Sequence, residues 1–237
     1  GRAFEFRKAR KMKRWSNMSK TFTRIGREII IAVKESGPDP SSNSRLRAII
    51  QNAKAANMPK DNIERAIKKA SEKSSENFKE VLLEGYAPHG IAILVEAATD
   101  NNNRTVANIR SYFNKCDGSL ATSGSVDFLF DHLCFFQIKD QGIDIDVLEL
   151  DLIDFGVIEL SKLENEISIT ARFEDFGSIQ KELERRGLEI SSSEFEREAK
   201  INKILTEDKR LKVERLINMI DEDEDVQNVY HDMKTID

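Results

Sequence analysis

Apolar residues between positions 19 and 70 recur at the spacing of α-helices. A first stripe covers residues 19–35 and consists of Phe22, Ile25, Ile29, Ala32 and Val33. A second stripe follows the cap candidates Ser41–Ser44 and consists of Leu46, Ile49, Ile50 and Ala53. A third begins at Pro59, which suits a first helical position, and consists of Ile63, Ala66, Ile67 and Ala70. At about 100° per residue, basic side chains fall opposite each stripe, which predicts a small three-helix bundle with basic outer faces.

The spacing of the apolar residues changes from that of helices to that of strands after a polar linker at residues 71–76. Residues 81–83, 91–95 and 126–130 are predicted strands, and Val106, Ile109, Tyr112 and Phe113 mark a helix between them. Residues 118–124 are predicted to form a loop. This stretch lacks a final helix and strand, and residues 204–237 supply both, around Leu216 and at residues 226–230.

The intervening segment repeats an α/β pattern. Strands are expected at 135–138, 157–161, 166–173 and 188–195, with a helix at 175–186. Residues 144–155 fit a strand by alternation and a helix by the stripe of Ile145, Leu148, Leu152 and Phe155, and we choose helix. The resulting βαββαβ order is typical of a ferredoxin-like unit. The predicted fold class is therefore α+β: an N-terminal three-helix bundle followed by two α/β (ferredoxin-like) domains, the second inserted into the first. The expected domains are 1–75, 76–133 plus 204–237, and 134–203.

The distribution of charge along the chain indicates what kind of partner the protein binds. Residues 1–75 carry 19 Lys and Arg against 7 Asp and Glu, a net of +12, while the rest of the chain has a net of −17. A basic N-terminal third on an acidic protein indicates a polyanionic partner. Residues 1–18 are expected to be a basic arm that binds phosphates, although a frayed, solvated tail is the alternative.

The predicted phosphate contacts lie on this arm and on the outer helix faces. They are Arg7, Lys8, Arg10, Lys11, Lys13, Arg14, Lys20, Arg24, Arg27, Arg47, Lys54, Lys60, Arg65, Lys68 and Lys69. Such contacts position a protein without reading sequence. Because no helix shows an obvious base-reading set, we expect weak DNA specificity or recognition of ribosomal RNA by shape. The acidic domains are expected to confine contact with a polyanion to the basic third.

Enzyme chemistry is poorly supported. The chain has no P-loop, no nucleophile-elbow motif and no HExxH, and its three histidines are isolated. Asp100 with Arg104 is either a charged pair in a cleft or a helix cap followed by a surface base, and the second is favoured. Residues 118–124 could cradle a phosphate but lack a following Lys. We expect no catalytic residue, metal or cofactor, no small-molecule substrate, and reduced, packed thiols at Cys116 and Cys134. We also expect no membrane contact and a cytoplasmic location.

Three stretches carry a resemblance to a known family: residues 57–67 (NMPKDNIERAI), 84–90 (EGYAPHG) and 99–105 (TDNNNRT). Together with the loop at 118–126 (GSLATSGSV), they are similar to the YebC/PmpR family over nearly the whole chain. The resemblance implies three domains, no catalysis and no cofactor. Bacterial members are usually described as DNA-binding transcriptional regulators, the mitochondrial relative is a translational activator, and some relatives look like ribosome-associated factors that ease translation of proline-rich stretches.

The function expected from these observations is a non-enzymatic, nucleic-acid-binding regulator of gene expression, acting as a DNA-binding transcriptional regulator. The alternative is a ribosome-associated translation factor that binds ribosomal RNA. An enzyme with a cleft at Asp100 and Arg104, and a module that binds only proteins, are the other hypotheses. The expected partners are DNA, ribosomal RNA or the ribosome.

Overall fold

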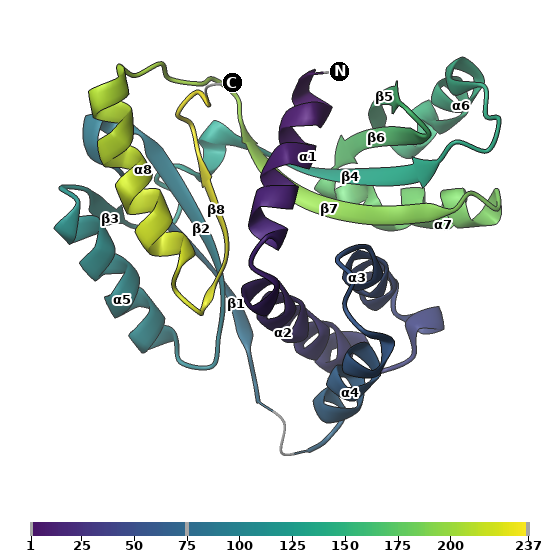
Figure 1. The fold of residues 1–237 in the computed structure, drawn as a ribbon, viewed down its shortest axis with the longest axis horizontal. Helices are drawn as coiled ribbons and strands as arrows, with labels where there is room; N and C mark the ends of the chain where they lie inside the picture. Colours follow the sequence, from purple (N-terminus) through teal and green to yellow (C-terminus); the bar gives the residue numbers. More distant parts are fainter. Residues whose placement is uncertain (1, 74–75, 236–237) are drawn as a thin grey trace. The chain divides into compact units, whose positions relative to one another are not determined.

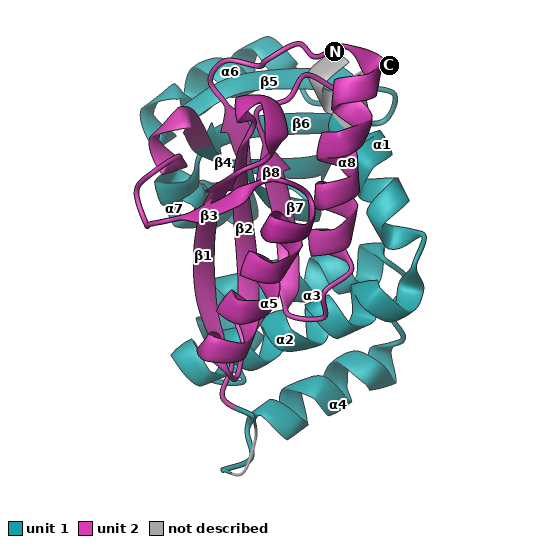
Figure 2. Cartoon of the chain, turned by 90° about the vertical axis from the view of Figure 1, so that its left-hand side faces the viewer, with its two compact units in different colours: residues 1–76, 132–196 teal, residues 77–131, 197–237 magenta. Residues whose placement is uncertain are grey.

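The computed structural model describes residues 2–73 and 76–235. The chain forms two compact units (Figures 1 and 2). Unit 1 combines residues 1–76 with residues 132–196, and unit 2 combines residues 77–131 with residues 197–237. The described residues hold eight α-helices and two four-stranded sheets, so the predicted α+β class is confirmed. The three-domain boundaries given above stay a prediction.

The N-terminal part of unit 1 is helical. It consists of α1 (Arg2–Trp15), α2 (Met18–Ser36), α3 (Ser44–Ala55) and α4 (Lys60–Ala70). Ile25, Ile29, Leu46 and Ile63 are buried, as the apolar stripes predict. Asn43 joins two of these helices: its side-chain oxygen accepts from Leu46 N at 3.0 Å to cap α3, and its amide donates to Ala32 O of α2 at 2.8 Å. The predicted bundle is confirmed, except that Pro59 is the N-cap residue of α4 and not its first helical residue.

The basic arm predicted over residues 1–18 is wrong as a description of the chain, because residues 2–15 form helix α1. The segment contains neither Gly nor Pro and is rich in Arg, Lys and Ala, which are strong helix formers. Its dense charge predicted a phosphate-binding arm, but acidic groups elsewhere in unit 1 neutralise part of that charge. Residues 71–73 of the predicted linker form a turn, and residues 74–75 lie outside the described residues.

The second part of unit 1 is the predicted βαββαβ element. It runs through β4 (Phe130–Lys139), α6 (Ile145–Leu152), β5 (Val157–Leu163), β6 (Glu166–Arg172), α7 (Phe176–Arg185) and β7 (Ile190–Ala199). The strand order β5-β6-β4-β7 is that of a ferredoxin-like sheet. Phe136 and Ile138 of β4 pack with Leu152 of α6 and Leu183 of α7 in one buried core. The choice of a helix within residues 144–155 is confirmed.

Helix α3 packs beside the β7 edge of this sheet. The side-chain amide of Asn52 pairs with the backbone of Ser193, accepting from its N at 2.8 Å and donating to its O at 2.5 Å. Ser44 of α3 donates to Gln180 of α7, whose amide returns a bond to Ser44 O at 3.1 Å. The helical part therefore satisfies backbone groups of this edge strand at Ser193.

Unit 2 contains a second sheet covered by two helices. Its elements are β1 (Lys79–Tyr86), β2 (Ala92–Thr99), α5 (Asn102–Lys115), β3 (Ser119–Ala121), α8 (Glu207–Asp221) and β8 (Val226–His231), and the strand order is β3-β1-β2-β8. Ile93 and Val95 of β2 pack with Phe113 of α5 and Leu216 of α8. Leu94 faces the other way and contacts a smaller cluster that includes Tyr230.

Two local predictions in unit 2 are wrong. The segment 118–124 contains strand β3, and residues 126–130 form a single helical turn over Asp127–Leu129 with only Phe130 in a strand. Glycines allow β3 to lie close to β1. A Cβ at Gly85 would be 2.7 Å from Ser119 O, and one at Gly118 would be 2.5 Å from Tyr86 O. Two glycines of the motifs noted above therefore serve close backbone packing.

Candidate nucleic-acid interface

Helix α1 turns one basic face toward the sheet of unit 1. The guanidinium of Arg7 lies 3.9 Å from the ring centroid of Phe135 on β4. Arg10 pairs with Glu196 at 2.5 Å, and Lys11 pairs with Glu194 at 2.5 Å. Both carboxylates belong to β7. Three of the predicted phosphate contacts are therefore engaged by groups of the protein itself.

Arg47 is engaged in the same way. Its guanidinium donates to Pro40 O at 2.9 Å and to Ser41 O at 3.2 Å, just before α3, and pairs with Glu184 of α7 at 3.2 Å. We call Arg7, Arg10, Lys11 and Arg47 the engaged basic set. Its members hold α1 and α3 to the rest of unit 1, so a phosphate would have to displace existing partners to reach them.

A second group of predicted contacts is exposed. We call it the open basic set, and it consists of Lys8, Lys13, Lys54, Lys60, Arg65, Lys68 and Lys69. Among the described residues its only ion pair is between Lys60 and Glu64, one helical turn apart at 3.8 Å, with the Lys60 side chain 83% exposed. Five members lie at the end of α3 or along α4, where Asp61 and Glu64 also lie.

The other predicted contacts are half-buried. Arg14 ends α1, and Lys20, Arg24 and Arg27 lie along the first half of α2. Each arginine in this group has at least one further interaction within the protein. The fifteen predicted residues thus do not share one environment, and the α3–α4 region carries most of the exposed charge.

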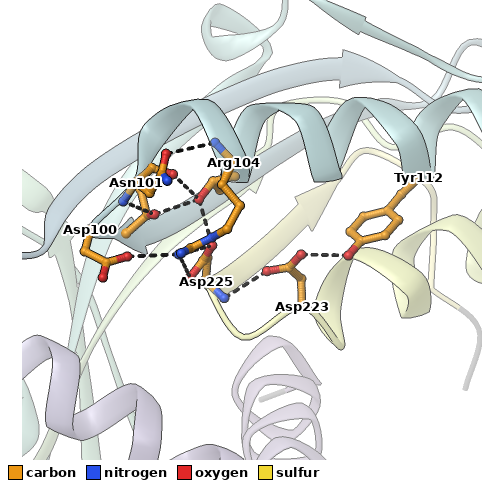
Figure 3. Close-up of polar contacts among 8 residues, drawn as sticks. Asp100, Asn101, Arg104, Tyr112, Asp223 and Asp225 are labelled. Atoms are coloured by element: carbon orange, nitrogen blue, oxygen red, sulfur yellow. Dashed lines mark hydrogen bonds and ion pairs between the residues drawn. The ribbon is translucent and has the colours of Figure 1, made fainter.

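The exposed pair Asp100 and Arg104 is joined to the buried carboxylate of Asp225 in unit 2, and we call this group the Asp225 anchor (Figure 3). Arg104 lies 2.9 Å from Asp100 and 3.1 Å from Asp225, whose side chain is only 5% exposed. Thr105 also donates to Asp225 at 2.7 Å. Hydrogen bonds to Asp225 and Asp100 raise the pKa of Arg104 above its ordinary value. The helix cap expected at Asp100 is in fact Asn101, which accepts from Arg104 N at 3.1 Å.

The same anchor uses the acidic run at residues 221–225. Asp223 accepts from the Tyr112 hydroxyl at 2.7 Å and from Asp225 N at 2.9 Å (Figure 3). Burial and the hydrogen bond to Asp223 raise the pKa of Tyr112 to about 12. These two carboxylates therefore tie β8 and the end of α8 to α5.

The loop at residues 118–126 holds a carboxylate of the protein. Glu84 is buried, and its oxygens accept from the backbone N–H groups of Gly124 at 2.6 Å, Val126 at 2.9 Å and Asp127 at 2.7 Å. Burial raises the pKa of Glu84, but these bonds and the nearby Arg197 outweigh burial and hold it below its ordinary value. The donors that a phosphate would need are thus already used by Glu84.

The structure also shows the surroundings of the two cysteines. Cys116 and Cys134 are buried free thiols, and burial raises the pKa of Cys134 to about 12. Within residues 2–73 and 76–235, no three His, Cys, Asp or Glu side chains are grouped so that they could hold a metal ion. No helix in the described part of the chain is long and apolar enough to cross a membrane.

The fold and these contacts define a multidomain α+β protein with a basic helical N-terminal part. The chain belongs to the TACO1/YebC family: residues 2–73 match the model of the family's N-terminal domain, and residues 78–233 match that of its second and third domains. The resemblance noted in the sequence is therefore confirmed.

Relatives and a solved structure support this assignment. The chain is 68% identical over 234 residues to a protein of Flavobacterium johnsoniae and 58% identical over 235 residues to one of Porphyromonas gingivalis, each named "Probable transcriptional regulatory protein". These alignments cover 99% of this chain and 99% and 97% of the relatives. A crystal structure of a conserved hypothetical protein from Aquifex aeolicus matches with a TM-score of 0.74 and 36% identity, over 92% of this chain and 90% of that one.

Proposed function

We propose that the protein is a nucleic-acid-binding regulator of gene expression and that the open basic set supplies most of its phosphate contacts. The observation that carries this proposal is the concentration of exposed basic side chains on α4 and the end of α3, in a chain whose net charge is −5. Duplex DNA is the proposed target, in keeping with the names of the relatives.

The composition of the open basic set favours contact with the nucleic-acid backbone over reading of bases. Six of its seven members are lysines, which bind phosphates as point charges, whereas arginine is the residue that pairs in bidentate fashion with guanine. Arg7, Arg10 and Arg47 are held by protein groups. This arrangement also supports the second candidate, recognition of folded ribosomal RNA by shape.

The test compares binding to random-sequence duplex DNA and to ribosomes across a salt series. The open variant carries Lys54→Gln, Lys60→Gln, Lys68→Gln and Lys69→Gln. Each phosphate contact that is lost should reduce the slope of log affinity against log salt by about 0.9 on DNA. We therefore expect the open variant to bind more weakly and to lose up to about 3.6 of that slope.

The matched control removes four exposed lysines elsewhere, through Lys115→Gln, Lys181→Gln, Lys209→Gln and Lys212→Gln. Equal losses in both variants would mean that only net charge matters and would contradict the proposed interface. Wild-type protein that stays on ribosomes at physiological salt while duplex binding collapses would identify the translation factor. The reverse order of salt sensitivity would favour transcription regulation.

A further inference from the structure

The stretch from residue 140 to residue 161 is acidic without interruption. It contains seven Asp and Glu residues and no Lys, Arg or His. In unit 1 it forms helix α6, the turn that follows and the first part of strand β5. Such a run alone is an ordinary solvated surface. What distinguishes it is the set of large apolar side chains that the same stretch exposes.

Helix α6 and the residues after it expose large apolar side chains on the side away from their core. Leu148 and Leu152 are buried beneath the helix, whereas Val147 is 53% exposed and Leu150 is 70% exposed. Val147 and Leu150 are spaced i, i+3, so they are neighbours on the outer face. Ile153 on the turn and Ile158 on β5 are each 55% exposed as well.

Six of the seven carboxylates divide into two groups, and the seventh, Glu149 of α6, is half-buried. Asp140 pairs with Lys162 at 2.6 Å and Asp151 pairs with Arg186 at 2.9 Å, while Asp144 caps α6. Asp146, Asp154 and Glu159 are exposed and have no ion pair among the described residues. We name the apolar residues Val147, Leu150, Ile153 and Ile158 together with these three carboxylates the acidic-apolar patch.

The position of the patch in unit 1 separates it from the basic helices. Strand β5 is the edge of the sheet opposite to β7, and β7 is the edge that α3 covers (Figure 1). The ladder between β5 and β6 is interrupted between Val157 and Glu159, so Ile158 is a bulged residue. A bulge discourages the addition of another strand at an edge. A partner would therefore be bound by side chains and not by backbone pairing.

We propose that the acidic-apolar patch is a docking surface for a basic, amphipathic helical segment of a partner protein. The exposed apolar side chains would contact the apolar stripe of that helix, and Asp146, Asp154 and Glu159 would pair with Lys or Arg on its flanks. The exposed carboxylates without ion pairs would repel the phosphates of a nucleic acid, so we take a protein as the occupant. This surface is separate from the open basic set, and the proposal does not rest on nucleic-acid binding.

The test measures binding of the full chain to a fluorescent peptide of about 18 residues, built from Leu and Lys at helical spacing. A scrambled peptide of the same composition is the control for charge. We expect saturable binding of the amphipathic peptide and at least about tenfold weaker binding of the scrambled one, because only the first presents its leucines on one face.

Two patch variants separate the apolar and charged contributions. One carries Leu150→Ser and Ile153→Ser, and the other carries Asp146→Asn, Asp154→Asn and Glu159→Gln. Each should weaken binding at least about tenfold, since each removes two or three contacts worth a factor of a few apiece. The replaced side chains are exposed, and circular dichroism and the unfolding midpoint check that each variant remains folded.

The matched controls change other exposed residues in the same way. They are Ile201→Ser with Ile204→Ser, and Glu207→Gln with Glu222→Gln and Glu224→Gln. Equal weakening by patch and control variants, or equal binding of the scrambled peptide, would overturn the proposal. So would a patch variant that leaves peptide binding unchanged. Self-association of the wild type that the patch variants abolish in sedimentation would identify a second copy as the occupant and would also overturn it.

Discussion

Glu84 is a buried carboxylate whose three closest polar neighbours are backbone N–H groups. It lies on β1, about forty residues before the loop that it holds, so no sequence period or spacing could reveal the contact. Asp100 and Arg104, by contrast, were recognised in the sequence as a candidate charged pair, but their buried partner Asp225 lies 121 residues beyond Arg104. The sequence could predict interactions between neighbouring residues such as Asp100 and Arg104. It could not predict the partners far along the chain, which decide what these side chains do in the fold.

We expect Glu84→Gln to lower the free energy of unfolding by about 1–3 kcal/mol, because an amide N–H₂ would face donors where a carboxylate oxygen now accepts. Chemical denaturation at pH 7 measures this loss. Glu80→Gln, an exposed change on the same strand, is the control and should cost about 0.5 kcal/mol or less.

The same substitution has a pH dependence of defined sign. The folded-state pKa of Glu84 is below its ordinary value, so its stabilisation is present above a pH of about 4.3 and disappears as the pH falls through the folded-state pKa. The difference in stability between wild type and Glu84→Gln should therefore shrink below about pH 4. A difference that is constant from pH 7 to pH 3 would contradict this account of the loop.

Helix α1 shows where prediction of elements from sequence succeeds and fails. The apolar stripes of α2, α3 and α4 were sufficient, because each helix buries its own stripe in a local bundle. The segment before them has no comparable stripe, since Arg7, Arg10 and Lys11 form its inner face. A helix that packs through charged side chains against a strand far along the chain has no pattern that a sequence period can detect.

The pairing of α1 with β7 leads to a prediction about binding. If Glu194→Gln and Glu196→Gln are introduced together, Arg10 and Lys11 lose their carboxylate partners and become available to phosphates. Affinity for duplex DNA should rise, and the slope of log affinity against log salt should steepen by up to about 1.8. Fluorescence anisotropy across a salt series measures both quantities.

The control for this experiment neutralises two carboxylates of α6 and the turn after it, through Asp146→Asn and Asp154→Asn. The net charge changes equally, but α1 keeps its partners, so the slope should remain that of the wild type. An equal effect of the two double variants would show that α1 and β7 do not compete with a polyanion.

The charge distribution of the whole molecule could be predicted from the sequence, and so could the fold class and the family. The environments of individual basic residues were not. Arg47 and Lys54 lie on the same helix and were predicted as equivalent contacts, yet Arg47 is held by Glu184 and Lys54 is exposed. That distinction depends on which face of α3 packs beside α7, and it is set by tertiary contacts between segments more than 130 residues apart.

The acidic charge of the remaining chain should limit non-specific binding. Replacing the exposed Glu207, Glu222 and Glu224 by Lys changes the net charge from −5 to about +1 and should raise affinity for random-sequence DNA and steepen its salt dependence. A variant with Gln at the same three positions should show a smaller increase in affinity for random-sequence DNA. Electrophoretic mobility of DNA at rising protein concentration measures the effect, and unchanged binding in the Lys variant would contradict it.

Because α1 and its partner strand β7 are far apart along the chain, the ribosome synthesises them at different times. Lys11 and Ser192, which are joined by a hydrogen bond in the folded protein, are 181 residues apart. At a synthesis rate of about 5–20 residues per second, roughly 10–35 seconds pass between the translation of one and of the other. During that interval the most basic helix of the protein leaves the ribosome without the carboxylates that later neutralise it, beside a surface made of phosphates. We therefore expect α1 of the nascent chain to attract RNA more strongly than α1 of the finished protein, in which Glu194 and Glu196 of β7 pair with Lys11 and Arg10.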